Sequence, residues 1–273
     1  MNSLDAVEAS LEKINSIDQN GYKLNSVIAI SDDALSQAKE FDRNGKSLPL
    51  QGLPILIKDN IEAVGLPATA GSLALANTPV LTDSTIASRL RDAGAIIVGA
   101  TNLSEWANIR STKSTSGWSA LGGLTANPWI HQHSAGGSSS GSGAAVAAGL
   151  TQWAIGSETD GSIICPASLN GCVGIKPTVG SIPRDGMIPI SESQDSPGPM
   201  AQTVSQASLL LDVLTGKNEF FKAATTNQKM KLGVVKQWFS EDSKVSGILE
   251  SARYGRVQGQ TLNLNLEYVL LQR

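Results

Sequence analysis

The stretch DSTIASRLRDAGAIIVG, residues 83–99, decides the fold class. Its first part places Ile86 and Leu90 at helical spacing, and Gly94 is expected to end the helix. The apolar run of residues 95–99 follows at once and is typical of a strand buried on both faces. A helix followed directly by a buried strand is the repeating unit of α/β proteins, so this stretch predicts an α/β fold.

The flanking segments continue the alternation of helices and strands. Residues 4–17 and 32–41 carry apolar side chains at helical spacing, and residues 24–30 are typical of a strand between them. The run GLPILIK, residues 52–58, predicts a buried strand with Lys58 at its tip. Together these segments predict a mixed central sheet covered by helices on both faces.

The length and composition set the domain organisation. The chain has 273 residues, of which 41% are hydrophobic and 16% charged, so it is long enough to bury a substantial core. We expect a single α/β domain over residues 1–249. From about Glu250 the sequence loses any clear helix or strand pattern, so residues 250–273 are expected to form an atypical, poorly ordered tail.

The charge pattern argues against two classes of partner. A net charge of -3 provides no basic face for phosphates, so nucleic-acid binding is not expected. The N-terminus carries acidic residues where a signal peptide would carry basic ones, and no apolar run reaches membrane-spanning length. We therefore expect a soluble, cytoplasmic protein that does not bind membranes. The sequence makes no prediction about the oligomeric state.

Metal binding and histidine catalysis find little support. Cys165 and Cys172 lack the spacing of zinc sites and are expected to pack in the core. His131 and His133 could in principle hold a metal, but no HExxH pattern accompanies them, so we expect no metal site. A Ser-His-Asp mechanism would need one of these two histidines, and both precede the serine-rich run. Another residue type is therefore expected to serve as the base.

The most informative block is GGSSSGSG, residues 136–143, followed by GSETDGSIICP, residues 156–166. Small residues at this density indicate tight turns whose peptide N–H groups can point at a ligand, as an anion nest or an oxyanion hole requires. Serines in such turns are candidate nucleophiles. The alternative, that they satisfy only local backbone groups, stays open from these residues alone.

Two other glycine-serine motifs fit less well. A phosphate-binding loop ends in Gly-Lys-Ser/Thr, whereas this run ends at Gly143 with no lysine before Lys176. A GxSxG nucleophile elbow needs a different spacing from Gly141-Ser-Gly143 and a histidine downstream. Lys58 could also merely end a strand with its ammonium group in water.

Taken together, three segments resemble the amidase signature family in order and spacing. They are LIKDN at residues 56–60, GGSSSGSGAA at residues 136–145 and GSETDGSI at residues 156–163. The segments LSEWAN at residues 103–108 and KPTVG at residues 176–180 look most like the peptide amidase branch of that family.

The resemblance implies a Ser-Ser-Lys triad. Ser162 would attack the amide carbonyl, Ser138 would pass the proton onward, and Lys58 would accept it and return it to the leaving ammonia or amine. Backbone N–H groups of four consecutive residues would form the oxyanion hole: Thr159, Asp160, Gly161 and Ser162. The resemblance also implies a cis peptide bond between Gly137 and Ser138, and it implies no cofactor because lysine and serines carry every proton transfer.

This mechanism makes a physical demand on Lys58. A free lysine has a pKa of about 10.4, so a lysine that acts as a base near neutrality must have its pKa lowered by several units. Burial can lower a lysine pKa by about 3–5 units. The apolar residues before Lys58 are consistent with the buried lysine of depressed pKa that the resemblance requires.

The resemblance runs to about Gly216, and members of the family extend well beyond this chain's end. The expected fold is therefore the amidase signature fold with its C-terminal part missing. Three functions remain: an amidohydrolase that cleaves linear carboxamides, with C-terminal peptide amides as candidate substrates; a subunit that needs partners, like the A-type subunit of tRNA-dependent amidotransferases; and a truncated, inactive amidase fragment. The lack of a basic face disfavours direct tRNA handling.

Overall fold

The computed structural model describes most of the chain, namely residues 2–45, 47–226, 244, 246–247, 256–257 and 260–261. The chain divides into two compact units, Met1–Thr225 and Thr226–Arg273. In the second unit, strands β9 (Arg256–Val257) and β10 (Gln260–Thr261) pair antiparallel. Most of the expected tail at 250–273 lies outside the described residues, and the domain boundary before it stays a prediction.

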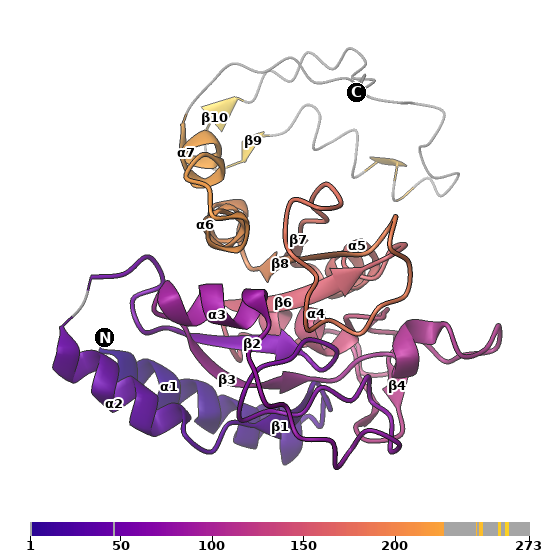
Figure 1. Cartoon of the computed structure of the whole chain (residues 1–273). Helices are drawn as coiled ribbons and strands as arrows, with labels where there is room; N and C mark the ends of the chain where they lie inside the picture. Colours follow the sequence, from indigo (N-terminus) through magenta and orange to yellow (C-terminus); the bar gives the residue numbers. More distant parts are fainter. Residues whose placement is uncertain are drawn as a thin grey trace. The chain divides into compact units, whose positions relative to one another are not determined.

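The first unit is built on a six-stranded mixed sheet with the order β1-β3-β2-β6-β8-β7 (Figure 1). Strand β2 pairs parallel with β3 and with β6, and the other neighbours pair antiparallel. The strands are β1 (Val27–Ile30), β2 (Pro54–Lys58), β3 (Ile96–Thr101), β6 (Trp153–Glu158), β7 (Val173–Gly174) and β8 (Ser196–Ala201). Every residue of β2, β3, β6 and β8 is buried, which confirms the buried strands expected at residues 52–58 and 95–99.

Helices surround this sheet. They are α1 (Ser3–Lys13), α2 (Ala34–Asn44), α3 (Thr85–Asp92), α4 (Ser140–Ala147), α5 (Ile164–Asn170), α6 (Val204–Thr215) and α7 (Phe220–Thr225). A π-helix (Ile14–Gln19) follows α1, and a short 3₁₀ helix (Glu105–Asn108) follows β3. Strands β4 (Trp118–Ser119) and β5 (Gly123–Leu124) form a small separate hairpin.

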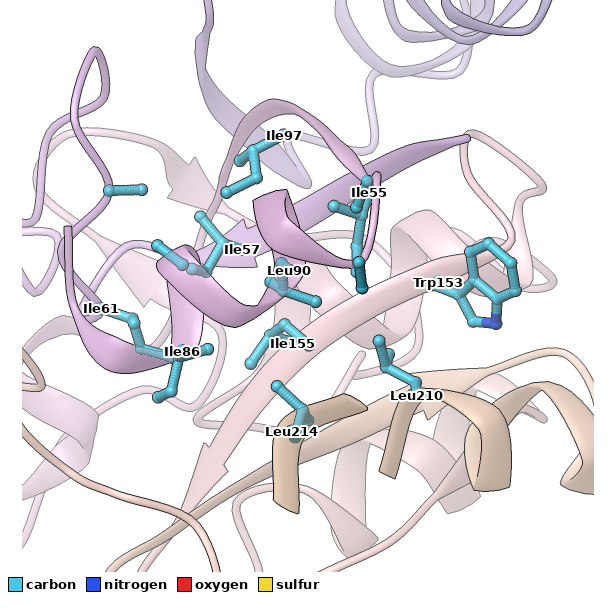
Figure 2. Packing of buried hydrophobic residues seen from close by; sticks show 14 of the residues in the cluster. Ile55, Ile57, Ile61, Ile86, Leu90, Ile97, Trp153, Ile155, Leu210 and Leu214 are labelled. Carbon is cyan, nitrogen blue, oxygen red and sulfur yellow. The ribbon is translucent and has the colours of Figure 1, made fainter. Parts of the chain in front are cut away.

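Alternating residues of β2 pack against different helices, which shows which helices cover each face of the sheet. Ile55 and Ile57 belong to a cluster with apolar residues of α3 and α6, such as Leu90 and Leu210 (Figure 2). Leu56 belongs to a second cluster with residues of α1, α2 and α4. Since successive side chains of a strand point to opposite faces, the sheet has helices on both sides, and the predicted fold class is confirmed.

Local chemistry explains where α3 begins and ends. The Ser84 side chain accepts a hydrogen bond from the Ala87 N–H at 3.2 Å, which caps the helix start. Gly94 follows the helix with a φ of +85°, a conformation that glycine adopts without steric cost. The predicted end of this helix is therefore confirmed.

Three sequence expectations differ from the structure. The strand expected at residues 24–30 begins only at Val27, because Asn25 has a φ of +53°, outside the extended region. The first α-helix ends at Lys13 and continues as a π-helix, whose buried Asp18 carboxylate accepts N–H groups from the start of the next strand. Cys165, expected in the core, is exposed on α5, whereas Cys172 is half-buried beside the core.

Among the described helices, none is both long and apolar enough to span a bilayer.

Replacing Leu90 tests the core between α3 and the sheet. Leu90 is fully buried, so we expect Leu90→Ala to lower the free energy of unfolding by about 2–5 kcal/mol through lost contacts and a residual cavity. Urea denaturation followed by circular dichroism measures this change. The matched control is Leu81→Ala, since Leu81 is 82% exposed and should shift stability by less than about 0.5 kcal/mol. Equal effects of both substitutions would contradict the packing.

Candidate active site

Lys58 is the last residue of β2 and has no solvent exposure. Its Nζ donates to Ser138 Oγ at 2.7 Å, to the Ser157 carbonyl oxygen at 3.1 Å and to Ser157 Oγ at 3.0 Å. Ser157 lies on the neighbouring strand β6, which pairs parallel with β2. The sheet therefore brings the lysine to three oxygen atoms, and the predicted burial of Lys58 is confirmed.

Burial lowers the pKa of Lys58 to about 7. The cause is the loss of hydration of the ammonium form, and it outweighs the negative charges of Glu158 and Asp195, which raise the pKa. Lys58 forms no salt bridge with any described residue. A substantial fraction of the amine is consequently neutral near pH 7, as the sequence argument requires of a base.

Ser138 is fully buried and lies just before α4. The peptide bond between Gly137 and Ser138 is cis, as the resemblance implies. A Cβ atom at Gly137 would lie 2.3 Å from Ser104 Oγ, and one at Gly141 would lie 2.3 Å from the Ser26 carbonyl oxygen. Glycines at these positions thus let the loop approach its neighbours closely.

Ser139 joins the two serine-bearing loops. Its N–H donates to the Ser162 carbonyl oxygen at 3.0 Å. Its Oγ donates to the Ser157 carbonyl oxygen at 3.1 Å and accepts from the Ser157 N–H at 3.2 Å. Ser139 is therefore a structural partner that joins the Ser162 loop to β6.

Ser162 lies half-buried in the loop between β6 and α5. Its hydroxyl group forms no hydrogen bond with any residue that the structure describes. The Glu158 carboxylate holds the loop by accepting the N–H groups of Ile163 at 2.6 Å and Ile164 at 2.9 Å. The structure thus brings Lys58 and Ser138 into direct contact and links Ser162 to them through Ser139.

The candidate oxyanion-hole residues form the same loop. The backbone N–H groups of residues 159–162 donate to no described residue, and Gly161 has a φ of +82°. Such consecutive free donors can bind a developing negative charge. This role, like the roles of the three triad residues, stays a prediction.

Asp195 is a buried site residue that the sequence analysis missed. One carboxylate oxygen accepts from Thr159 Oγ1 at 2.5 Å, and the other accepts from the N–H groups of Ile190 at 2.8 Å and Ser191 at 2.9 Å. Asp195 also lines a cavity of about 330 Å³. No motif spacing connects Asp195 with Thr159, so only the fold shows that they meet.

Asp59, next to Lys58, is directed away from the amine. Its carboxylate accepts hydrogen bonds from Thr69 Oγ1, from the Thr69 N–H at 3.3 Å and from the Gly71 N–H at 3.1 Å. Burial raises the pKa of Asp59 to about 6. Asp59 therefore holds the loop at residues 69–71 against the end of β2.

Neither histidine forms a hydrogen bond with these residues within the described part of the chain. The ring of His131 packs edge-on against Tyr22, with 5.0 Å between the ring centroids. Within the described part of the chain, no group of three or more His, Cys, Asp or Glu side chains could hold a metal ion.

Comparisons with known proteins place the chain in context. The family model described as Amidase matches residues 5–249. The chain is 42% identical over 231 residues to the A-type subunit of glutamyl-tRNA(Gln) amidotransferase from Methanosarcina acetivorans, covering 80% of this chain and 48% of that protein. A probable amidase of Arabidopsis thaliana is 44% identical over 233 residues, covering 83% of this chain and 45% of that protein.

Among solved structures, the native peptide amidase from Stenotrophomonas maltophilia superposes with a TM-score of 0.77 and 49% sequence identity. The match covers 84% of this chain and 48% of that chain. The chain spans about half the length of the curated relatives it matches.

The depressed pKa of Lys58 predicts how stability depends on pH. Between pH 7 and about 10.4 the unfolded state binds more protons at this lysine than the folded state, so the free energy of unfolding should rise with pH. The slope from this residue approaches about 1.4 kcal/mol per pH unit above the folded pKa. We expect Lys58→Met to remove this dependence, as measured by urea denaturation at several pH values.

Lys39 provides the control for this experiment, because it lies exposed on α2. The Lys39→Met variant should keep the same pH dependence as the unsubstituted chain. Parallel stability profiles for the Lys58→Met variant and the unsubstituted chain would show that Lys58 keeps an ordinary pKa.

Proposed function

Because the chain belongs to the amidase signature family, we propose that it hydrolyses linear carboxamides with Ser162 as the nucleophile. The observation that carries the proposal is the 2.7 Å hydrogen bond between the buried amine of Lys58 and Ser138 Oγ. A lysine whose pKa is lowered to about 7 can accept a proton near neutrality and give it back. The free hydroxyl of Ser162, on the adjoining loop, is the group that this base would activate.

The proposed reaction has two halves. In the first, Ser162 Oγ attacks the carbonyl carbon, its proton moves to Ser138 Oγ, and the proton of Ser138 moves to Lys58 Nζ. The C–N bond then breaks as the proton returns through Ser138 to the leaving nitrogen, which leaves an acyl group on Ser162. In the second half, water replaces the serine as nucleophile, and the same relay restores the free enzyme and releases the acid.

The negative charge on the carbonyl oxygen would be stabilised by the N–H groups of residues 159–162. Their lack of partners among the described residues supports this role, since unsatisfied donors are ready to bind an oxyanion without first breaking other hydrogen bonds. Removing one such donor typically costs about 10²–10³ in rate. Asp195 and Lys176 support the loop, because they bind Thr159 through its hydroxyl and its carbonyl oxygen, respectively.

We propose C-terminal peptide amides as the substrate class. This proposal rests on the 49% identity to the peptide amidase from Stenotrophomonas maltophilia. The oxyanion-hole segment supports it, because the motif GSETDGS, residues 156–162, keeps an aspartate at position 160 that resembles the peptide amidase branch.

A second candidate is a subunit of an amidotransferase that acts only with partner chains. The 42% identity to the A-type subunit of glutamyl-tRNA(Gln) amidotransferase favours it. The two candidates share the nucleophile and the base, so they differ in the substrate and in the need for partners.

Active-site labelling with a fluorophosphonate tests the nucleophile. We expect a single covalent adduct on Ser162, located by mass spectrometry of the modified peptide, because an activated serine displaces fluoride from phosphorus. Ser162→Ala should remove all labelling. Ser168→Ala, an exposed position on the following helix α5, should be labelled as fast as the unsubstituted chain. Absence of label on folded protein, or label retained by Ser162→Ala, would refute the assignment.

Substrate assays separate the two candidates. Release of ammonia from amidated peptides by this chain alone would support the amidohydrolase. Hydrolysis of glutamine that begins only after amidotransferase partner chains are added would support the second candidate instead.

A further inference from the structure

We propose that Ser157 and Asn60 are positioning residues that turn the lone pair of the Lys58 amine toward Ser138. This inference rests on the proposed function, because it concerns the direction in which the lysine exchanges its proton. Within the described residues, the amine hydrogens of Lys58 have three oxygen acceptors to share them.

The proton count at Lys58 Nζ differs between its two states. The ammonium form has three hydrogens for three acceptors: Ser138 Oγ, the Ser157 carbonyl oxygen and Ser157 Oγ. The neutral amine has two hydrogens and one lone pair, so one of the three neighbours must donate to it. For the relay to work, that donor has to be Ser138.

Ser157 determines whether this arrangement holds. Its carbonyl oxygen can only accept, so it takes one amine hydrogen. Its hydroxyl can either accept the second hydrogen or donate its own. If the Ser157 hydroxyl donated, the lone pair of Lys58 would be occupied, and its second hydrogen would point at Ser138. In that state Lys58 could not receive the proton of Ser138. The hydroxyl of Ser157 therefore needs another acceptor for its hydrogen.

Asn60 is in place to supply that acceptor. Its carboxamide nitrogen lies 3.0 Å from Ser157 Oγ, while its Oδ1 is buried and has no hydrogen-bond partner in the described part of the chain. A half-turn of the carboxamide exchanges the nearly identical oxygen and nitrogen. In either orientation, one end of the Asn60 carboxamide has no partner, so the unpartnered atom does not distinguish the two. The orientation with Oδ1 toward Ser157 is favoured because it gives the Ser157 hydroxyl hydrogen an acceptor.

Two adjacent strands and the turn after β2 fix the positions of Lys58, Ser157 and Asn60 relative to one another. Lys58 ends β2, Ser157 lies near the end of the parallel strand β6, and the Asn60 N–H donates to the Lys58 carbonyl oxygen at 2.7 Å in the turn that follows. Asn60 is 4% exposed and Ser157 is 7% exposed. Water consequently has little access to this site and cannot easily take over the hydrogen bonds of either side chain.

The test uses two substitutions of Ser157 with two readouts. The pKa of Lys58 is measured from the side-chain NMR signals of isotope-labelled lysine, and the rate of fluorophosphonate labelling is measured above that pKa, where Lys58 is neutral. Ser157→Ala removes one acceptor of the ammonium form, so we expect a lower pKa for Lys58 and labelling about tenfold slower or more. Ser157→Thr keeps the hydroxyl and should restore both values.

A merely structural role of Ser157 would not produce this combination, because a lower pKa alone makes more of the neutral base available. Asn60→Asp gives a second check. Its carboxylate can still accept the hydrogen of Ser157, so labelling at high pH should persist, while the added negative charge should raise the pKa of Lys58. Asn60→Ala offers no acceptor and should slow labelling at every pH.

Failure of this inference is distinguishable from failure of the proposed function. If the unsubstituted chain is labelled, and Ser157→Ala is labelled equally fast above the Lys58 pKa, the positioning role is wrong and the nucleophile assignment stands. If the unsubstituted chain is not labelled, the proposed function fails, and the NMR readout tests the contact that the inference needs: an unchanged Lys58 pKa in Ser157→Ala overturns the inference, whereas a lowered one supports the contact between Ser157 and the ammonium form.

Discussion

Keeping the amine of Lys58 out of water governs how the residues around it are arranged. An ammonium group in a dry site is costly unless a carboxylate or several acceptors surround it. The two acidic residues whose charges raise the pKa of Lys58 form their hydrogen bonds elsewhere: Glu158 accepts the N–H groups at the start of α5, and Asp195 accepts from Thr159 and two backbone N–H groups. Their charges raise the pKa of Lys58 without forming a salt bridge with it. The loss of hydration has the larger effect, so the pKa of Lys58 is lowered.

Periodicity and motif order were sufficient for the fold and for the position of Lys58. The alternation of a helix and a buried strand at residues 83–99 predicted the sheet, and the apolar run at residues 52–58 predicted a buried strand with Lys58 at its tip. Both predictions rest on the spacing of apolar residues within a short stretch of sequence, which indicates which side chains face the core. The start of β1 escaped the same reasoning, because Asn25 has a left-handed φ, and an apolar pattern carries no information on a single backbone angle.

The side-chain contacts of the site were harder to predict than its residues. The motifs placed Ser138 and Ser162 near Lys58 through a family resemblance, but nothing in their spacing indicated that Ser139 would tie the two loops together. Asp195 meets Thr159 across 36 residues, and Asn60 meets Ser157 across 97 residues. Such pairs depend on strand order, and a single sequence contains no signal for them. The same limit explains Cys165, a residue type that is usually buried but here lies on the outer side of a short helix.

The location of these contacts separates the chemistry of the site from its choice of substrate. The described hydrogen bonds of the Lys58 amine join residues of two adjacent strands and the loop before α4, and the residues of the proposed oxyanion hole directly follow one of those strands. This set lies within residues 58–162, although the chain spans about half the length of the relatives it matches. The proposed proton relay therefore depends on the sheet and on the two loops beside it, whereas the fit of an amide depends on what surrounds the half-buried Ser162. Proteins of similar fold can consequently differ in substrate, as the peptide amidase and the amidotransferase do by name.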